Sequence, residues 1–139
     1  MRARTLLAVL VLLAASCGGG GEQQGGGGGG GTITLSDGQL AVDRGTARVS
    51  GTAATIDAGD FFFSPTILEG PPGQEVTLTV TNTGQALHNF SIPGGSVDVD
   101  LQAGESTTVT VTFPSSGAVT FECKYHLAQD MRGELRAAS

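Results

Sequence analysis

Residues 75–81, EVTLTVT, alternate between polar and apolar side chains. In an extended chain this alternation places Val76, Leu78 and Val80 on one face and the threonines on the other, as in a half-buried β-strand. A second segment, STTVTVTF at residues 106–113, repeats the pattern. β-branched residues favour strands, and neither segment shows a helical period. The two segments therefore predict an all-β protein.

Turn-forming residues separate these and other short apolar runs throughout residues 54–139. The turns are rich in Gly, Pro, Asn and Ser, and they are EGPPGQ (69–74), TNTGQ (81–85), PGG (93–95), QAGES (102–106) and PSSG (114–117). Strands spaced roughly 8–12 residues apart indicate a β-sandwich, here of about 7–8 strands. The pattern is weaker at 32–53, which we interpret as an N-terminal extension or extra strands.

The amino-terminal residues 1–17, MRARTLLAVLVLLAASC, combine Arg2 and Arg4 with an apolar run and a small-residue ending. This is the layout of a secretory signal, and the apolar run is too short for a permanent membrane span. The ending resembles the lipobox of bacterial lipoprotein precursors, which implies lipidation of Cys17. We therefore expect an exported protein, anchored through Cys17 to the outer face of the cell membrane or to the periplasmic side.

Residues 18–31 are almost pure glycine, which loses much entropy on ordering and has no side chain to bury. We interpret them as a flexible tether. The remaining chain, roughly 85–105 residues, is sufficient for one domain, and we expect it to be monomeric. The formal net charge is −6, and loss of Arg2 and Arg4 with the leader would bring it to about −8. This charge argues against nucleic acid as a partner.

The segment FECKYHLAQDM, residues 121–131, contains Cys123, His126 and Met131, although the whole chain has only two residues of each type. A further candidate ligand, His88, lies upstream in the segment HNFSI. In extended strands each strand-borne donor would share the inward face with apolar residues. These pairings are His88 with Phe90, Cys123 with Phe121, and Met131 with Leu135. The spacing therefore predicts that donors from separate strands meet at one end of the sandwich.

A thiolate, two imidazoles and a thioether form a donor set that favours copper, in the arrangement of electron-transfer copper sites. Zinc would accept Cys and His but gains little from Met. Multicopper oxidases and nitrite-reducing centres need more than two histidines, and the binuclear centre of cytochrome oxidase needs two bridging cysteines. Cys–His nucleophilic catalysis would need oxyanion donors that no motif supplies. A Cys17–Cys123 disulfide is disfavoured, because the glycine-rich context of Cys17 offers nothing ordered to join.

The run from Cys123 to Met131, with H88-N-F upstream, resembles the cupredoxin family of small blue copper proteins. FFFSPTI (61–67), PGQEVTLTVTNTG (72–84) and MRGELR (131–136) resemble further strands of that family, so the likeness covers 54–139. The resemblance implies a Greek-key sandwich that holds one type 1 copper ion. It implies four ligands, which are His88, Cys123, His126 and Met131. It also implies that the backbone N–H of Asn89 donates to the copper-bound sulfur.

The function implied by the resemblance is single-electron transfer at the cell envelope, without enzymatic activity. Electrons would enter and leave at the outer edge of His126, and the candidates for a surrounding docking patch are Leu87, Pro93, Leu127 and Ala128. The expected partner is a redox protein such as a cytochrome or a membrane-bound reductase or oxidase. Two alternatives stay open, namely a copper-delivery lipoprotein without an electron-transfer role and an adhesion-type sandwich without metal.

Overall fold

The computed structural model describes residues 30–139, so the predictions for the signal sequence, Cys17 and nearly all of the tether lie outside the described residues. Residues 30–139 form twelve β-strands and one 3₁₀ turn, η1 (Leu127–Gln129). The predicted all-β class is confirmed. The strands outnumber the expected 7–8 or so, because the N-terminal segment adds three and several are only three or four residues long. In this range no helix is long and apolar enough to cross a membrane.

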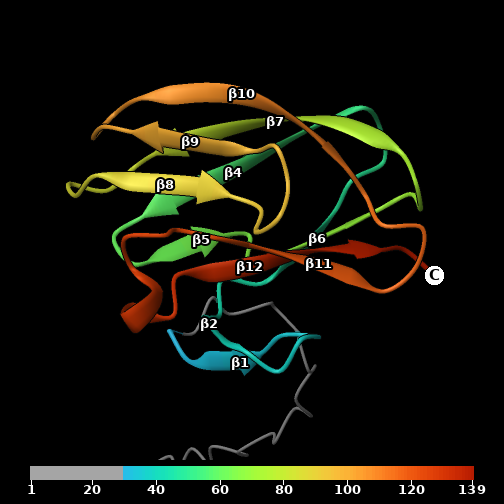
Figure 1. Ribbon diagram of the computed structural model, residues 1–139, viewed down its shortest axis with the longest axis horizontal. Helices are drawn as coiled ribbons and strands as arrows, with labels where there is room; N and C mark the ends of the chain where they lie inside the picture. Colours follow the sequence, from blue (N-terminus) through green and yellow to red (C-terminus); the bar gives the residue numbers. More distant parts are fainter. Residues whose placement is uncertain (1–29) are drawn as a thin grey trace, which may run out of the picture.

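Two sheets face each other to form the sandwich (Figure 1). The first has four strands, in the spatial order β10 (Ser106–Thr112), β7 (Glu75–Asn82), β4 (Ala53–Gly59) and β5 (Phe62–Ser64). The second has six, in the order β3 (Thr46–Arg48), β6 (Ile67–Gly70), β12 (Arg132–Ala137), β11 (Ala118–Glu122), β8 (His88–Ser91) and β9 (Asp98–Leu101). A separate hairpin consists of β1 (Thr32–Thr34) and β2 (Leu40–Val42).

The chain crosses repeatedly between the two sheets. After β7 in the first sheet it enters the second sheet, where β8 and β9 form an antiparallel pair, and β10 then returns to pair with β7. The last strand, β12, lies antiparallel to β11 and parallel to β6. This connectivity confirms the predicted Greek-key sandwich, in which strands distant in sequence become neighbours.

The alternation at residues 75–81 determines the centre of the first sheet. In the antiparallel β7–β10 pair, Leu78 lies opposite Val109 and Val76 opposite Val111. Val76, Leu78 and Val80 are buried, as predicted, while the threonines between them take the outer face. Each such burial contributes about 1.5–3 kcal/mol relative to an exposed side chain. The pair therefore supplies much of the apolar wall against which the second sheet packs.

An aromatic cluster fills the space between the sheets. The ring of Phe63 makes edge contacts with Phe90 and Phe121, with centroid distances of 5.9 and 5.2 Å, and Phe90 and Phe121 lie 5.0 Å apart. All three rings are fully buried. Cys123 and Met131 belong to the same apolar cluster. The core therefore extends to two of the predicted ligands, and its close packing restricts their movement.

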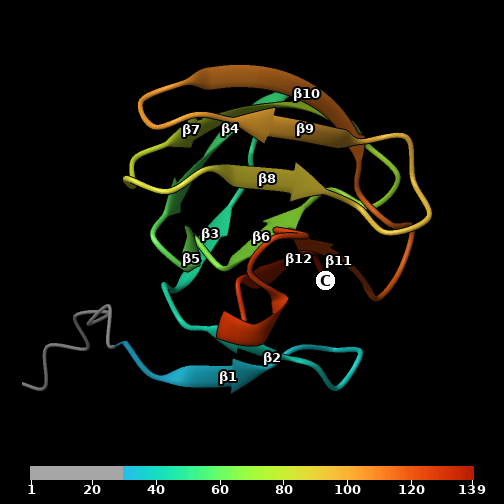
Figure 2. The same cartoon turned by 60° about the vertical axis from the view of Figure 1, so that its left-hand side comes forward.

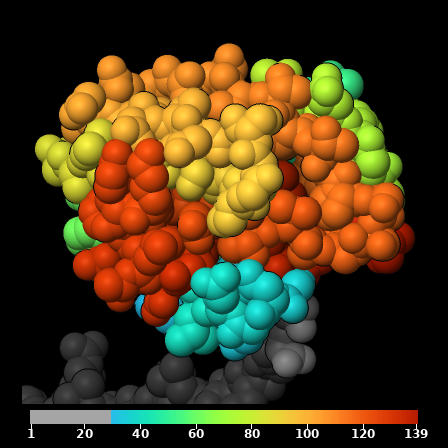
Figure 3. Space-filling model, viewed as in Figure 1, coloured from blue at the N-terminus to red at the C-terminus, as the bar shows by residue number. Residues whose placement is uncertain are grey.

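The segment 32–53 forms extra strands. β3 adds to the edge of the second sheet by parallel pairing with β6, whereas the β1–β2 hairpin packs beside η1 and the last strands (Figures 1 and 2). Hydrogen bonds attach the hairpin to the sandwich; among them, Val42 N–H donates to the carbonyl of Asp130 (3.2 Å), and the Thr120 hydroxyl donates to Asp37 (2.6 Å). In the space-filling view the hairpin, in cyan, forms a lobe under the red C-terminal residues (Figure 3).

The hairpin also covers a carboxylate on β12. Successive residues of a strand point to opposite faces, so Glu134 points away from the core that buries Leu135. Glu134 is nevertheless fully buried. The backbone N–H of Ser36, in the hairpin turn, donates to Glu134 (2.9 Å), and the guanidinium of Arg136 pairs with it. The buried charge is therefore paired and hydrogen-bonded, as its burial requires.

Candidate metal centre

Three predicted ligands meet at one end of the sandwich. The Nδ1 atoms of His88 and His126 lie 3.3 Å apart, and Sγ of Cys123 lies 3.4 Å from Nδ1 of His126. One donor atom from each of the three residues falls within 4.8 Å of the other two. Each side chain comes from a different position in the fold: His88 begins β8, Cys123 follows β11, and His126 lies between β11 and η1. The strand faces inferred from the alternation therefore bring His88 and Cys123 together, and the loop after β11 adds His126.

A tight loop presents two of the donors. The N–H of His126 donates to the carbonyl of Cys123 (3.0 Å), and the N–H of Cys123 donates to the carbonyl of Met131 (3.0 Å). The N–H of Met131 donates in turn to the carbonyl of His126 (3.3 Å). The C-x-x-H spacing thus corresponds to one hydrogen-bonded turn, and the backbone fixes the loop at both ends. Met131 is fully buried next to this loop, and its role as a ligand stays a prediction.

Asn89 lies directly behind the thiol. Its backbone N–H donates to Sγ of Cys123 (3.3 Å). Its side-chain amide donates to the carboxylates of Asp98 and Asp100 (2.7 Å each), and its amide oxygen accepts from the N–H of Lys124 (3.4 Å). Asn89 therefore connects the start of β8 with β9 and with the loop that follows Cys123.

The two histidines differ in their access to solvent. His88 is fully buried, whereas His126 is only partly buried and makes an edge contact with the ring of Phe61 at 4.9 Å. Burial, followed by the proximity of His88, lowers the pKa of His126. Both effects favour the neutral imidazole, which is the form that binds metal. Because His88 and Cys123 are fully buried and His126 is not, His126 is the donor that lies nearest the surface.

Apolar residues are exposed near His126. Phe61 and Leu87 rank among the large apolar side chains that remain exposed, at 41% and 38%. Of the other predicted docking residues, Ala128 is exposed and Leu127 is half-buried. Pro93 is exposed too, but it follows the carboxyl end of β8, whereas His88 stands at the start of that strand, so the prediction that Pro93 lies beside His126 is wrong. Exposed apolar side chains beside His126 suit a transient protein contact.

Asp60 is a contact of the site that sequence reasoning missed. Its carboxylate lies 3.1 Å from Nε2 of His88, although 28 residues separate the two in the chain. It also accepts the N–H groups of Ala86 and Gln85, and these bonds, with the contact to His88, lower the pKa of Asp60. No motif marks Asp60, because only the fold brings the β4–β5 turn against β8.

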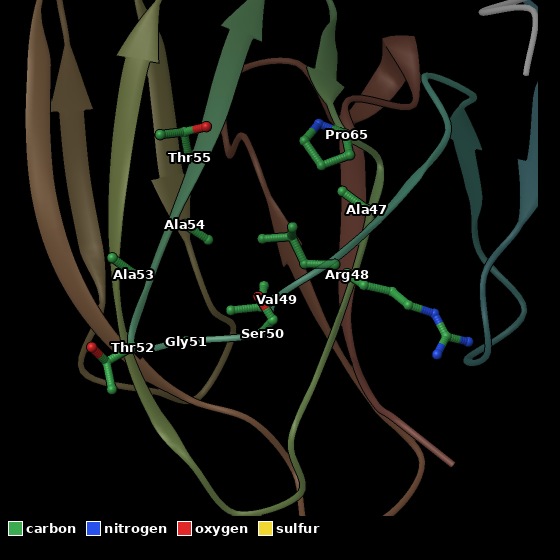
Figure 4. A pocket seen from close by; sticks show the side chains of 11 residues that line it. Ala47, Arg48, Val49, Ser50, Gly51, Thr52, Ala53, Ala54, Thr55 and Pro65 are labelled. Carbon is green, nitrogen blue, oxygen red and sulfur yellow. The ribbon is translucent and has the colours of Figure 1, made fainter.

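A cavity of about 500 Å³ lies elsewhere, between β3 and the first half of β4 (Figure 4). Its walls include Val49, Ala54, Pro65 and Leu68, and it contains none of the predicted ligands. β4 runs from this cavity to the turn at Asp60, which is a distance of about 20 Å at 3.3 Å per residue. The cavity is therefore separate from the donor group.

The donor group fits copper. A soft sulfur ligand beside two imidazoles matches the preference of copper, and a buried sulfur that accepts a backbone N–H is typical of a tuned metal ligand. Hard cations such as magnesium or calcium would instead need carboxylate and carbonyl oxygens around them. The His88, Cys123 and His126 group on this fold therefore indicates copper binding.

Solved structures of copper proteins share this fold. Dithionite-reduced auracyanin from Roseiflexus castenholzii matches with a TM-score of 0.56 and 23% identity, over 66% of this chain and 100% of that one. The metal-binding domain of the Cu(I)-exporting ATPase CopA from Streptococcus pneumoniae D39, solved with Cu(I), matches with a TM-score of 0.58 and 12% identity, over 69% of this chain and 98% of that one. At such identities the likeness shows the fold alone.

Comparison of sequences adds a curated relative and a family. Cytochrome c oxidase subunit 2 from Thermus thermophilus is 29% identical over 66 residues, which make up 48% of this chain and 48% of that protein. The match thus spans about half the length of the relative. The cupredoxin-like domain family matches residues 6–137, and so includes the segment 32–53 for which the sequence alone suggested no counterpart. Because this match covers nearly the whole chain, the protein belongs to the cupredoxin-like domain family.

Proposed function

We propose that this protein is a mononuclear type 1 copper protein that carries single electrons between redox partners at the cell envelope. The observation that carries the proposal is the convergence of His88, Cys123 and His126, with the sulfur buried and facing the N–H of Asn89. One thiolate and two imidazoles with a nearby thioether are the ligands of electron-transfer copper sites.

His88, Cys123 and His126 would hold the ion, with Met131 as a weaker fourth ligand. Copper when bound supplies a one-electron change between Cu(II) and Cu(I). The chain's own contribution is to keep these side chains in place during that change. The hydrogen-bonded loop and the packed aromatic core support this role, because both resist movement of the ligands.

Electron exchange is assigned to the edge of His126. It lies nearer the surface than the other two donors, and the exposed Phe61 and Leu87 supply apolar area beside it. A small apolar contact would let a partner approach this edge and leave again quickly. The domain has no second cluster of His, Cys or acidic ligands among residues 30–139, so the proposal includes no catalytic copper and no substrate chemistry.

The signal-like residues 1–17 support export, and the lipobox-like ending supports attachment through Cys17. In this proposal residues 18–31 tether the copper domain of 54–139, with its extra strands at 32–53, to the membrane. The similarity to a cytochrome c oxidase subunit favours a partner of the oxidase type. Cys17 and Cys123 are the only cysteines, and Cys17 lies in the signal-like segment, so the proposal includes no binuclear copper centre bridged by two cysteines.

The test is spectroscopic. The purified protein is loaded with Cu(II), and its visible absorption and electron paramagnetic resonance spectra are recorded. We expect a strong thiolate-to-copper band and a narrow copper hyperfine splitting, both lost in Cys123→Ser. A colourless copper complex with a wide splitting would contradict a type 1 site.

A second measurement separates a carrier from a copper-delivery protein. Voltammetry should give a reversible one-electron wave, and the bound copper should resist a Cu(I) chelator. Rapid loss of Cu(I) to the chelator, with no reversible wave, would favour delivery instead.

A further inference from the structure

Asp60 and Phe61 form the turn between β4 and β5, outside the donor group, and each contacts one histidine. Oδ1 of Asp60 lies 3.1 Å from Nε2 of His88, and the ring of Phe61 meets the ring of His126. Phe61 adopts a φ of 72°, which is unusual for a residue with a bulky side chain. Strained backbone of this kind concentrates at functional sites, where the surrounding structure holds it in place.

The contact with Asp60 involves the nitrogen of His88 that faces away from the other donors. Nδ1 of His88 points to His126, whereas Nε2, on the opposite side of the ring, points to the carboxylate. An ionised carboxylate only accepts hydrogen bonds, so the geometry assigns the proton to Nε2. Nδ1 of His88 is then left with a free lone pair on the side where the donors meet.

The carboxylate itself is held by the segment that leads into β8. One oxygen of Asp60 accepts the N–H groups of Gln85 (2.9 Å) and Ala86 (3.0 Å), in addition to the contact with His88. A Cβ at Gly84 would stand 2.2 Å from the same oxygen. Only glycine therefore leaves room for the carboxylate at this point, and the position of Asp60 is fixed from three sides.

We infer that Asp60 is a positioning residue for His88, which holds the imidazole as its Nε2–H tautomer and makes Nδ1 a stronger donor. A stronger donor stabilises the more highly charged metal, so Asp60 favours Cu(II) over Cu(I). The side chain of Asp60 is 39% exposed, so water screens part of its charge, but the carboxylate accepts directly from Nε2 and its charge strengthens that hydrogen bond. The statement about copper rests on the proposed function, whereas the statement about the tautomer does not.

Three variants of the full-length protein separate charge from geometry. Asp60→Asn keeps an oxygen that can accept from His88 but removes the charge. Gly84→Ala keeps the charge but displaces the carboxylate. Asp57→Asn, three residues earlier on β4, removes an exposed charge away from the ligands and is the matched control.

The first readout uses the copper-free protein. Imidazole ¹⁵N chemical shifts report which ring nitrogen carries the proton, and we expect His88 to be the Nε2–H tautomer in the native protein, Asp60→Asn and Asp57→Asn. Gly84→Ala should give a mixture of tautomers. An Nδ1–H tautomer in the native protein would overturn the inference, whether or not the chain binds copper.

The second readout is the reduction potential of the copper-loaded variants. We expect Asp60→Asn to shift the Cu(II)/Cu(I) equilibrium about tenfold toward Cu(I), which corresponds to a rise of ~59 mV for one electron. Asp57→Asn should leave the potential near that of the native protein. Equal shifts in Asp60→Asn and Asp57→Asn would show a general charge effect and overturn the positioning role. If the native protein gave no blue copper spectrum, the proposed function would fail, and the tautomer measurement would still decide the Asp60–His88 contact.

Discussion

Gly133 on β12 lies opposite Phe121 on β11, and the ring of Phe121 occupies the space where a side chain at Gly133 would begin. A Cβ at this position would stand 2.4 Å from the ring and 2.3 Å from the carbonyl oxygen of Thr66. Phe121 is fully buried on β11, and only Glu122 separates it from Cys123. The absence of a side chain at Gly133 therefore allows the core to close directly beneath the donor group.

Gly133→Ala should destabilise the protein by about 1–3 kcal/mol, because neither the ring of Phe121 nor the backbone of Thr66 can move aside without disturbing the core. Urea unfolding would measure the change in the free energy of unfolding. Gly51→Ala is the control: a Cβ there meets nothing within 4 Å, and the expected change is within about 0.5 kcal/mol. Equal stabilities of the two variants would contradict the close packing at Gly133.

Met131→Leu should retain copper and raise its reduction potential. Leucine fills a similar volume in the core but offers no sulfur, so the ligand that modestly favours Cu(II) is lost while Cys123, His88 and His126 remain. Voltammetry should show a rise equivalent to about a tenfold shift toward Cu(I), or ~59 mV. Complete loss of copper in this variant would argue that Met131 is more than a weak ligand.

Acid should weaken the attachment of the β1–β2 hairpin through Asp37. The hydrogen bond from the Thr120 hydroxyl is the main cause that lowers the pKa of Asp37 in the folded protein. A lowered folded-state pKa stabilises the fold above pH ~4 and loses this contribution as the pH falls through the folded-state value. Asp37→Asn should therefore lose more stability at pH 7 than at pH 3, as measured by urea unfolding at both pH values. A loss that is the same at both would exclude the ionised carboxylate as the cause.

Glu134→Ala should cost about 2 kcal/mol, since it removes the acceptor of the Ser36 N–H and the partner of Arg136 in a buried position. Limited proteolysis within residues 30–45 should become faster, because the hairpin loses one of its attachments. Ser36→Ala removes only the hydroxyl contact (3.2 Å) and keeps the backbone N–H, so its effect should be smaller, at about 0.5–1.5 kcal/mol. Slower cleavage in Glu134→Ala than in Ser36→Ala would contradict this ranking.

Local patterns predicted what depends on single strands. The alternation at residues 75–81 identified the buried face of β7, and the same parity placed His88 and Cys123 on inward faces at strand ends. These features follow from the two-residue period of a strand, which a sequence displays directly. The fold class and the inward faces of His88 and Cys123 could be predicted for that reason, while His126 was placed by its C-x-x-H spacing from Cys123.

Contacts between distant segments could not be predicted in this way. The bonds from Ser36 to Glu134 span 98 residues, and the contact of Asp60 with His88 depends on where the β4–β5 turn falls against another sheet. A single acidic residue in a turn or on a strand carries no sign of its partner. The burial of Glu134 and the role of Asp60 therefore became visible only from the assembled sandwich.

The hydrogen bond between Val42 and Asp130 has a mechanical consequence. Tension applied from the amino-terminal side of the described chain reaches the β1–β2 hairpin before any strand of the sandwich, and through Val42 it acts on the residues between His126 and Met131. A pull on this end would thus act on the loop that carries His126, and also on β11 and β12 through Thr120 and Glu134.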